Sequence, residues 1–343
     1  MIVLGIESSC DECAAAVVAD GKNILSNIVA TQIPFHAPYK GVVPEIASRK
    51  HTEWIYTVVK EALDAAGVSV AEVNAVAVTS RPGLLGSLLV GLSFAKAFAW
   101  ARGIPFIAVD HMLAHLYAPR LLDSDTSAAY ETPPEYPFLG LLVSGGHSFI
   151  CRADDFDDIT VLGATIDDAV GEAFDKIAKH YGFGYPGGAV IDALAKNGDS
   201  GAFRFPMPNL YKGRHRYDMS YSGLKNAAIN QLELFKKKPG EIIPNDIAAS
   251  FQKTAVDILL RSLFNAVEDS GLNTVVAGGG VAANSYLRAR LAENTKLRCI
   301  FPRPHLCGDN GAMIAGIGYH YLARGEYSPL DETASARVSG FKR

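Results

Sequence analysis

The strongest constraint on the fold is a pattern that occurs twice: an apolar run, a short polar turn and a second apolar run. The two copies are VLGIESSCDECAAAVV at residues 3–18 and LGLLVSGGHSFICRA at residues 139–153. Each copy predicts two strands joined by a tight turn. Because 343 residues exceed what one hydrophobic core usually supports, we expect two lobes. Each lobe would begin with such a hairpin. Two lobes that each start with a small polar turn suggest a nucleotide held in a cleft between them.

The rest of the chain alternates between strand-like and helix-like patterns. Further strands are expected at residues 24–31, 74–80, 104–110 and 159–165, and helices at 44–66, 84–102, 166–182, 246–270 and 310–325. This alternation predicts an α/β fold with helices packed on mixed sheets. We expect an N-terminal lobe of residues 1–110 together with 310–330, and a C-terminal lobe of residues 111–309. Residues 123–137, rich in Ser, Thr, Asp and Pro, predict a surface insertion.

Composition excludes several classes of protein. The formal net charge of −4 gives no global positive field, so nucleic-acid binding would need a local basic patch or a partner. The five cysteines are scattered, which favours a reducing compartment such as the cytoplasm over a disulfide framework. No basic flank precedes the first apolar run, so we expect no secretory signal. The apolar stretch 84–102 is interrupted by Lys96 and predicts a buried helix rather than a membrane span.

The segment HMLAH contains two histidines, His111 and His115, four positions apart. On a helix they would lie one turn apart on the same face, as two ligands of one metal ion would. Asp309, in the turn before the last helix, is the natural third ligand, although it could instead cap that helix. Two imidazoles and a carboxylate suit Fe²⁺ or Zn²⁺, with a harder metal such as Mg²⁺ possible. Met112 stands where a zinc protease of the H-E-x-x-H kind needs glutamate, which argues against that class.

Three glycine-rich turns, at residues 144–147, 186–188 and 277–280, are candidate ligand-binding loops. Ser144-Gly145-Gly146-His147 could direct backbone N–H groups at a phosphate, or could simply close a hairpin. The run 277–280 leads from a strand to a helix but lacks the dinucleotide spacing G-x-G-x-x-G, so a nicotinamide cofactor is not indicated. Asn284 after it could cap the helix or contact a base or ribose.

Cys10 and Cys13 have C-x-x-C spacing, which at the end of a strand is more typical of a tight turn than of a metal or redox site.

Taken together, ten stretches in this order resemble one family, the tRNA threonylcarbamoyladenosine transferases (TsaD). They are GIESSCDE, GVVPEIASRKH, RPGLLGSLLVG, HMLAH, LLVSGGHS, IDDAVGEAFDKIAK, YPGG, YSGLK, AGGGVAAN and CGDNGAMIA. The resemblance implies the two-lobed actin-like ATPase fold of the actin/Hsp70/sugar-kinase superfamily. It also implies transfer of a threonylcarbamoyl group from threonylcarbamoyl-AMP to the exocyclic amine of the adenosine after the anticodon in ANN-decoding tRNAs, with release of AMP. The alternative within the same fold is an ATP-dependent kinase or ATPase.

By position, the resemblance implies roles for individual residues. His111, His115 and Asp309 would hold one divalent metal ion. The adenylate would be bound by Leu142, Val143, Ser144, Gly145, Gly146, Asp175, Gly188, Asp192 and Asn284. Glu12 is our candidate for an acid/base or orienting role. The chain departs from the family pattern at Cys13, where Thr is expected, and at Asp110, where His is common.

The resemblance also implies partners. Besides tRNA and threonylcarbamoyl-AMP, a bacterial enzyme of this kind would work with a smaller paralogue, TsaB, and a P-loop ATPase, TsaE, and no membrane is involved. Candidate tRNA contacts are the basic segments 211–217 and 49–51, where Lys and Arg could meet phosphates and Tyr could stack on a base. The lysine run 236–238 is more typical of a solvated face.

Overall fold

The computed structural model describes residues 1–123, 133–210, 213–237, 244–338 and 341–342. It forms two compact units. Unit 1 comprises Met1–Pro134 with Pro302–Phe341, and unit 2 comprises Glu135–Phe301 with Lys342–Arg343. This division differs from the expected boundary at 110/111, because the helix that begins at His111 packs against the last helix of the chain, Gly311–Ala323, within unit 1. Most of the expected insertion, at 124–132, lies outside the described residues.

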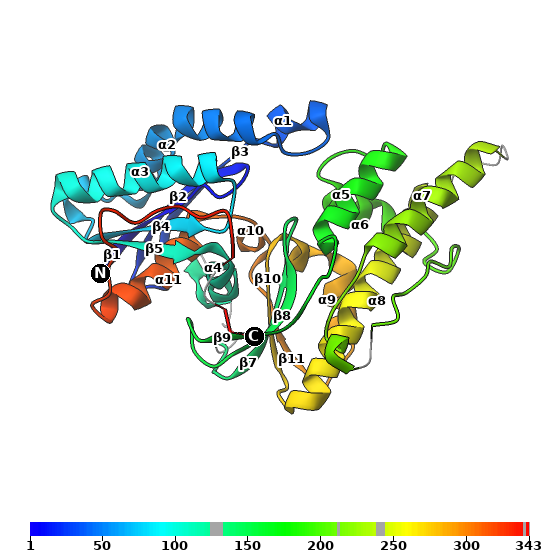
Figure 1. Cartoon of the computed structure of the whole chain (residues 1–343). Helices are drawn as coiled ribbons and strands as arrows, with labels where there is room; N and C mark the ends of the chain where they lie inside the picture. Colours follow the sequence, from blue (N-terminus) through cyan, green and yellow to red (C-terminus); the bar gives the residue numbers. More distant parts are fainter. Residues whose placement is uncertain (124–132, 211–212, 238–243, 339–340, 343) are drawn as a thin grey trace. The chain divides into compact units, whose positions relative to one another are not determined.

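Unit 1 contains a six-stranded sheet with helices on both faces. The strands run in the order β5-β4-β1-β2-β3-β6, and the elements are β1 Ile2–Glu7, β2 Glu12–Ala19, β3 Asn23–Thr31, β4 Ala75–Arg81, β5 Phe106–Asp110, β6 Leu122–Asp123, α1 Ile33–His36, α2 Pro44–Ala66, α3 Leu85–Arg102, α4 His111–Tyr117, α10 Pro304–Cys307 and α11 Gly311–Ala323. Helices α2 and α3 cover one face, and α4 and α11 cover the other (Figure 1). Side chains along β1 point alternately to the two faces of the sheet. Leu4 and Ile6 therefore join the core under α2 and α3, whereas Gly5 contacts α11.

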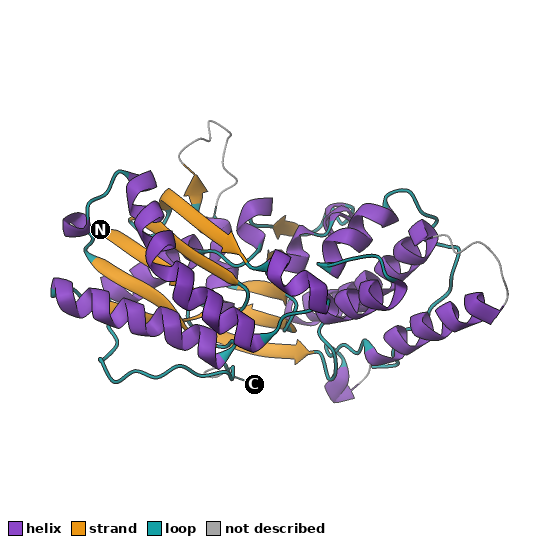
Figure 2. Ribbon diagram, turned by 90° about the horizontal axis from the view of Figure 1, so that it is seen from above, coloured by secondary structure: helices purple, strands orange, loops and turns teal. Residues whose placement is uncertain are grey.

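Unit 2 contains a five-stranded sheet in the order β11-β10-β7-β8-β9. Its elements are β7 Phe138–Val143, β8 Ser148–Ala153, β9 Ile159–Ala164, β10 Thr274–Gly278, β11 Arg298–Ile300, α5 Val170–Tyr181, α6 Gly187–Ala195, α7 Ser222–Lys237, α8 Pro244–Ser270 and α9 Ser285–Ala292. As in unit 1, helices pack against the strands (Figure 2). None of the described helices is both long and apolar enough to cross a membrane.

Five strands of each sheet have the same topology, to which unit 1 adds β6, and this confirms the duplication expected from the sequence. In each, three consecutive strands form an antiparallel meander, β1-β2-β3 and β7-β8-β9. Two later strands then add in parallel beside the first strand, β4 and β5 in unit 1 and β10 and β11 in unit 2. The chain therefore has a two-lobed α/β fold with mixed sheets flanked by helices.

One helix begins later than its sequence pattern predicts. The acids Asp167 and Asp168 precede α5 rather than forming its first turn. The Asp167 carboxylate accepts hydrogen bonds from Ser220 Oγ at 2.5 Å and Ser222 Oγ at 2.7 Å, and Asp168 pairs with two lysines. These two charges therefore serve tertiary partners rather than the N-terminus of the helix, where acids are also favoured.

Candidate functional site

Helix α4 brings the two histidines of HMLAH onto one face. Strand β5 ends at Asp110, whose carboxylate accepts a hydrogen bond from the Met112 N–H at 2.8 Å and so caps α4. Asp110, one of the two positions at which this chain departs from the family pattern, therefore starts the helix that carries both histidines. His111 is 8 % exposed and His115 is 1 % exposed, so both side chains are buried.

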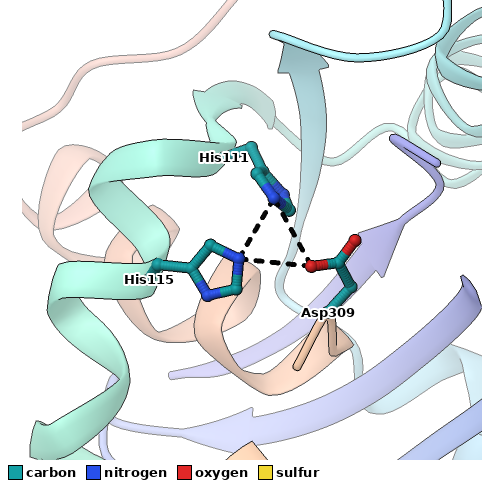
Figure 3. Close-up of side chains that lie close together, drawn as sticks. All are labelled: His111, His115 and Asp309. Carbon is teal, nitrogen blue, oxygen red and sulfur yellow. Dashed lines mark hydrogen bonds and ion pairs between the residues drawn. The ribbon is translucent and has the colours of Figure 1, made fainter. Parts of the chain in front are cut away.

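Asp309 reaches both rings from the turn between α10 and α11. Its Oδ1 lies 3.2 Å from His115 Nε2 and 3.5 Å from His111 Nε2, and the two Nε2 atoms are 3.1 Å apart (Figure 3). The alternative role considered for Asp309, capping the last helix, is wrong. Asn310 caps α11 instead, since its Oδ1 accepts from the Met313 N–H at 3.0 Å. The Asp309 carboxylate is thereby free to face the histidines.

These three donors have a geometry that fits a metal ion. Among the residues that the structure describes, His111, His115 and Asp309 form a group whose ligand atoms all lie within 4.8 Å of one another. Ligands about 2.1 Å from an ion, at angles between about 90° and 109°, are about 3.0 to 3.4 Å apart. The observed separations of 3.1 to 3.5 Å match that range to within about 0.1 Å. Three ligands on one side leave coordination positions for water or substrate.

The electrostatics of the group favour a cation. Burial raises the pKa of the Asp309 carboxyl, but the two histidines lower it more, and the resulting pKa is about 2. Burial lowers the pKa of His111, whereas Asp309 and Glu7 raise it, to about 9. Burial and the neighbouring charge of His111 lower the pKa of His115. The chain thus places two ionised carboxylates around one imidazolium, and a divalent cation would replace that proton.

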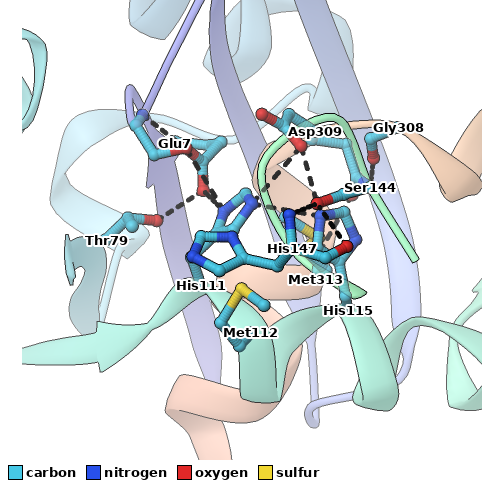
Figure 4. A network of polar contacts seen from close by, with 12 residues as sticks. Glu7, Thr79, His111, Met112, His115, Ser144, His147, Gly308, Asp309 and Met313 are labelled. Carbon is cyan, nitrogen blue, oxygen red and sulfur yellow. Dashed lines mark hydrogen bonds and ion pairs between the residues drawn. The ribbon is translucent and has the colours of Figure 1, made fainter. Parts of the chain in front are cut away.

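Glu7 is a contact of this group that the sequence analysis did not single out. It is fully buried at the end of β1, and its Oε2 lies 3.0 Å from His111 Nδ1 (Figure 4). The signal was present in the sequence, because a glutamate that directly follows VLGI in a buried strand needs a specific partner. The sequence analysis chose Glu12, from the same hairpin, instead.

Glu12 begins β2 and is partly buried. Burial raises its pKa well above the ordinary value, and the neighbouring carboxylates of Asp11 and Asp309 add to that effect. Thr31 Oγ1 donates a hydrogen bond to Glu12 Oε1 at 3.3 Å. A carboxyl group in this environment can hold a proton near neutral pH, as a general acid or base must.

Cys13 does not fit a metal or redox role. It is fully buried in β2. Burial, together with the charge of Glu7, raises the pKa of its thiol to about 12. Since the thiolate is the reactive and metal-binding form, Cys13 stays an inert core side chain.

In unit 2, the turn of the second hairpin is open to solvent. Ser144 N–H donates to His147 O at 2.8 Å, which closes the turn. Gly145 and Gly146 are exposed, and a Cβ at either position would meet no atom within 4 Å. Leu142 and Val143, which were also expected to bind the adenylate, differ from the two exposed glycines, because their side chains are fully buried in β7. Only the turn itself presents groups to a ligand.

Asp192 and Asn284, 92 positions apart in the sequence, lie together. Asn284 Oδ1 accepts from the Leu287 N–H at 2.9 Å and caps α9, while its Nδ2 donates to Asp192 Oδ1 at 3.1 Å. Asp192 also accepts from Ser285 Oγ at 2.8 Å. Asn284 therefore has its structural role, the helix cap, and at the same time links the glycine turn after β10 to α6.

Asp175, in α5, and Gly188, in the first turn of α6, both lie near the start of α6. Asp175 Oδ1 accepts from the Gly187 N–H at 2.7 Å, so its carboxylate fixes the turn that precedes the helix. A Cβ at Gly188 would meet no atom within 4 Å. In this segment Asp175 supports the turn and Gly188 provides an open backbone surface.

The sequence comparisons agree with this arrangement. Residues 23–316 match the family model for TsaD, tRNA N6-adenosine threonylcarbamoyltransferase. A protein of that name from Treponema denticola is 64 % identical over 343 residues, which cover 100 % of this chain and 99 % of the relative. The chain belongs to the TsaD family. A relative of the same name from Borreliella burgdorferi is 50 % identical over 343 residues, covering 100 % of this chain and 96 % of the relative.

Solved structures similar to this TsaD-family chain support its fold. The component A of (R)-2-hydroxyglutaryl-CoA dehydratase from Acidaminococcus fermentans has a TM-score of 0.56 at 14 % identity and covers 94 % of this chain and 99 % of that chain. HypF from T. kodakarensis has a TM-score of 0.59 at 15 % identity and covers 94 % of this chain and 48 % of that chain. At these identities the likeness concerns the fold alone, which is of the two-lobed actin-like type.

Several basic residues expected to meet tRNA pair with acids of this TsaD-family chain. Arg216 pairs with Asp269 at 2.6 Å, and Tyr217 donates to the same carboxylate. Arg49 and Lys50 pair with acids on their own helix, at 2.9 and 2.6 Å. Residues 211–212 and the side chains of the lysine run 236–238 lie outside what the structure describes.

Proposed function

We propose that this chain transfers the threonylcarbamoyl group of threonylcarbamoyl-AMP to the N6 amine of the adenosine 3′ of the anticodon in ANN-decoding tRNAs and releases AMP. The observation that carries the proposal is the identity of 64 % along the whole chain with a relative named for this transfer to tRNA adenosine. The His111–His115–Asp309 group supports it from the geometry of unit 1.

The reaction forms a bond between N6 and the carbamoyl carbon and breaks the bond from that carbon to the phosphate oxygen of AMP. The N6 amine of adenine is a poor nucleophile, so the acceptor carbonyl has to be polarised. The proton that N6 loses passes to a base or to water. AMP leaves readily because its phosphate is already a stable anion. The protein therefore mainly has to position the two substrates and stabilise negative charge, and no covalent enzyme intermediate is needed.

One divalent metal ion would be held by His111 Nε2, His115 Nε2 and Asp309 Oδ1. When bound, it would supply Lewis-acid stabilisation of the charge that develops on the carbonyl or phosphate. Two neutral nitrogens and one carboxylate suit Fe²⁺ or Zn²⁺ better than Mg²⁺, which prefers oxygen ligands. That preference also distinguishes the group from the acid-only magnesium site that a kinase of the same fold would need.

The adenylate would be bound by residues of unit 2. The exposed turn Ser144–Gly146 and the open backbone at Gly188 offer N–H groups to a phosphate. Asp192 and Asn284 would orient the nucleoside, and Asp175 would hold the turn before α6. Glu12, in unit 1, would accept or return the proton of the amine, a role that its raised pKa supports.

Protein partners belong to the proposal as well. The net charge of −4 gives no global positive field, and Arg49, Lys50 and Arg216 are paired with acids of the same chain. We therefore expect full activity only with the smaller paralogue TsaB and the ATPase TsaE. The modification would take place in the cytoplasm, where tRNA is found.

The test is a transfer assay with defined components. The chain, TsaB and TsaE are incubated with threonylcarbamoyl-AMP and an ANN-decoding tRNA, and the digested nucleosides are analysed by mass spectrometry. We expect threonylcarbamoyladenosine with the wild-type chain and a large loss with Asp309→Asn. No modified adenosine with all partners present would refute the proposal. ATP hydrolysis that needs neither the donor nor tRNA would favour the kinase or ATPase alternative.

A further inference from the structure

Glu7 is a buried carboxylate whose contacts are all hydrogen-bond donors. It is 0 % exposed. Its Oε1 accepts from the Ser9 N–H at 2.6 Å, and its Oε2 accepts from Thr79 Oγ1 at 2.5 Å and from His111 Nδ1 at 3.0 Å (Figure 4). An ionised carboxylate in the interior is very costly unless it is paired and hydrogen-bonded. In the described part of the chain, His111 is the group with which Glu7 forms an ion pair.

The contact with Glu7 decides which nitrogen of His111 carries a proton. A neutral imidazole has one N–H donor and one acceptor, and either nitrogen can be the donor. An ionised carboxylate only accepts, so His111 Nδ1 must donate to Glu7. Once a cation replaces the second proton of the imidazolium, Nε2 is the nitrogen with the lone pair, and it faces His115 Nε2 and Asp309 Oδ1, 3.1 and 3.5 Å away.

His115 has no comparable support. Its Nδ1 is buried and has no hydrogen-bond partner among the described residues. Of the two rings, only His111 is therefore held in one tautomer and one orientation by a carboxylate. The hydrogen-bond contact between Glu7 and the metal group is accordingly made through His111.

From these contacts we infer that Glu7 is a positioning residue of the metal centre: it fixes the Nδ1–H tautomer of His111 and strengthens Nε2 as a ligand for a divalent cation. Thr79 holds the same carboxylate oxygen from β4 and keeps Glu7 directed at the ring. The inference rests on the proposed metal centre and adds to it a residue from β1 that touches neither ion nor substrate. Carboxylates in this position typically change metal affinity by about 10- to 100-fold.

The test measures metal binding by the full-length chain without tRNA or donor. Co²⁺ is titrated and followed by its visible absorption, and Zn²⁺ affinity is then obtained by competition. Glu7→Gln, which keeps the shape but removes the charge, should weaken Co²⁺ binding by about 10-fold or more. Glu53→Gln, an exposed acid of the same unit, is the matched control and should bind as the wild type does. Thr79→Val should weaken binding less than Glu7→Gln but measurably, by about threefold or more.

A double-mutant cycle separates positioning from general destabilisation. Because Glu7 acts through His111, adding Glu7→Gln to His111→Ala should change Co²⁺ affinity by less than about twofold. Thermal melting and far-UV circular dichroism report whether each variant folds, and if Glu7→Gln does not fold, Thr79→Val decides the question. Affinities within about twofold of the wild type in the folded variants would overturn the inference while leaving the metal centre intact. Co²⁺ binding that is undiminished in the folded His115→Ala variant would instead overturn the metal centre itself.

Discussion

A methyl group at Gly5 should separate β1 from the helix that follows Asp309. A Cβ at this position would lie 2.2 Å from Gly311 O, 2.6 Å from Ala315 N and 2.8 Å from Ala315 Cβ. The first two atoms belong to the backbone of α11, which cannot move aside as a flexible side chain can. Helix α11 packs equally closely on the neighbouring strand, because a Cβ at Gly311 would lie 2.6 Å from Ala16 N in β2. The strands and α11 therefore pack backbone to backbone.

Gly5→Ala is expected to act as a severe overpacking substitution. Extra methyl groups in a packed core cost about 1 to 3 kcal/mol, and the rigid backbone contacts place this one near the upper limit. For a unit of this size, about 3 kcal/mol lowers the melting temperature by about 6 to 12 °C. Calorimetry measures the midpoint, and hydrogen exchange of β1 and α11 shows whether the loss lies in unit 1. The shift of α11 should also weaken Zn²⁺ binding, because Asp309 directly precedes that helix.

Gly223→Ala is the matched control for the Gly5 variant. Gly223 is exposed in the first turn of α7, and a Cβ there would meet no atom within 4 Å. This variant should melt at the wild-type temperature or slightly above it, because Ala is favoured over Gly in helices. A Gly5→Ala midpoint within about 2 °C of the wild type would refute the close packing of β1 against α11.

Three further predictions concern single carboxylates. Asp110→Ala should destabilise α4 by about 1 kcal/mol through the lost cap, measured by chemical denaturation, whereas Asp110→Asn should retain most of the stability, and equal losses would contradict the capping role. Burial raises the pKa of Asp168, but Lys176 and Lys225 lower it more, so its net pKa is below the usual value. The contribution of Asp168 to the free energy of unfolding should therefore be complete above about pH 4 and be lost as the pH falls further. Melting curves of Asp168→Asn should show a weaker dependence on acid pH than those of the wild type. Glu12→Gln should reduce the rate of transfer to tRNA, and turnover near that of the wild type would exclude Glu12 from the chemistry.

Much of the fold could be predicted from the sequence because its signals are local. Helix α2 begins and ends where its apolar spacing, Pro44 and Gly67 predicted, and Gly67 adopts the left-handed conformation, with φ 64°. Both hairpins followed from alternating apolar runs. Strand β11 and helix α7 were missed. The strand has three residues and the helix mixes polar and apolar residues, so neither carries a strong pattern.

The candidate site shows where local reasoning ends. The spacing of His111 and His115 predicted a shared helix face, and the structure confirms it. The sequence did not distinguish whether Asp309 or Asn310 caps the last helix, because both are good caps. It also did not pair Glu7 with His111, 104 positions away, because that contact depends on the order β5-β4-β1 in the sheet. Contacts of this kind arise only from tertiary packing.

Metal stoichiometry tests the central claim most directly. The chain is purified without chelator, and its bound Fe and Zn are quantified by mass spectrometry beside His115→Ala and Asp309→Asn, with folding of each variant checked by circular dichroism. We predict about one divalent ion per wild-type chain and a strong loss in both folded variants, because each removes one of three ligands. Equal metal content in the wild type and both variants would contradict a metal centre at His111, His115 and Asp309.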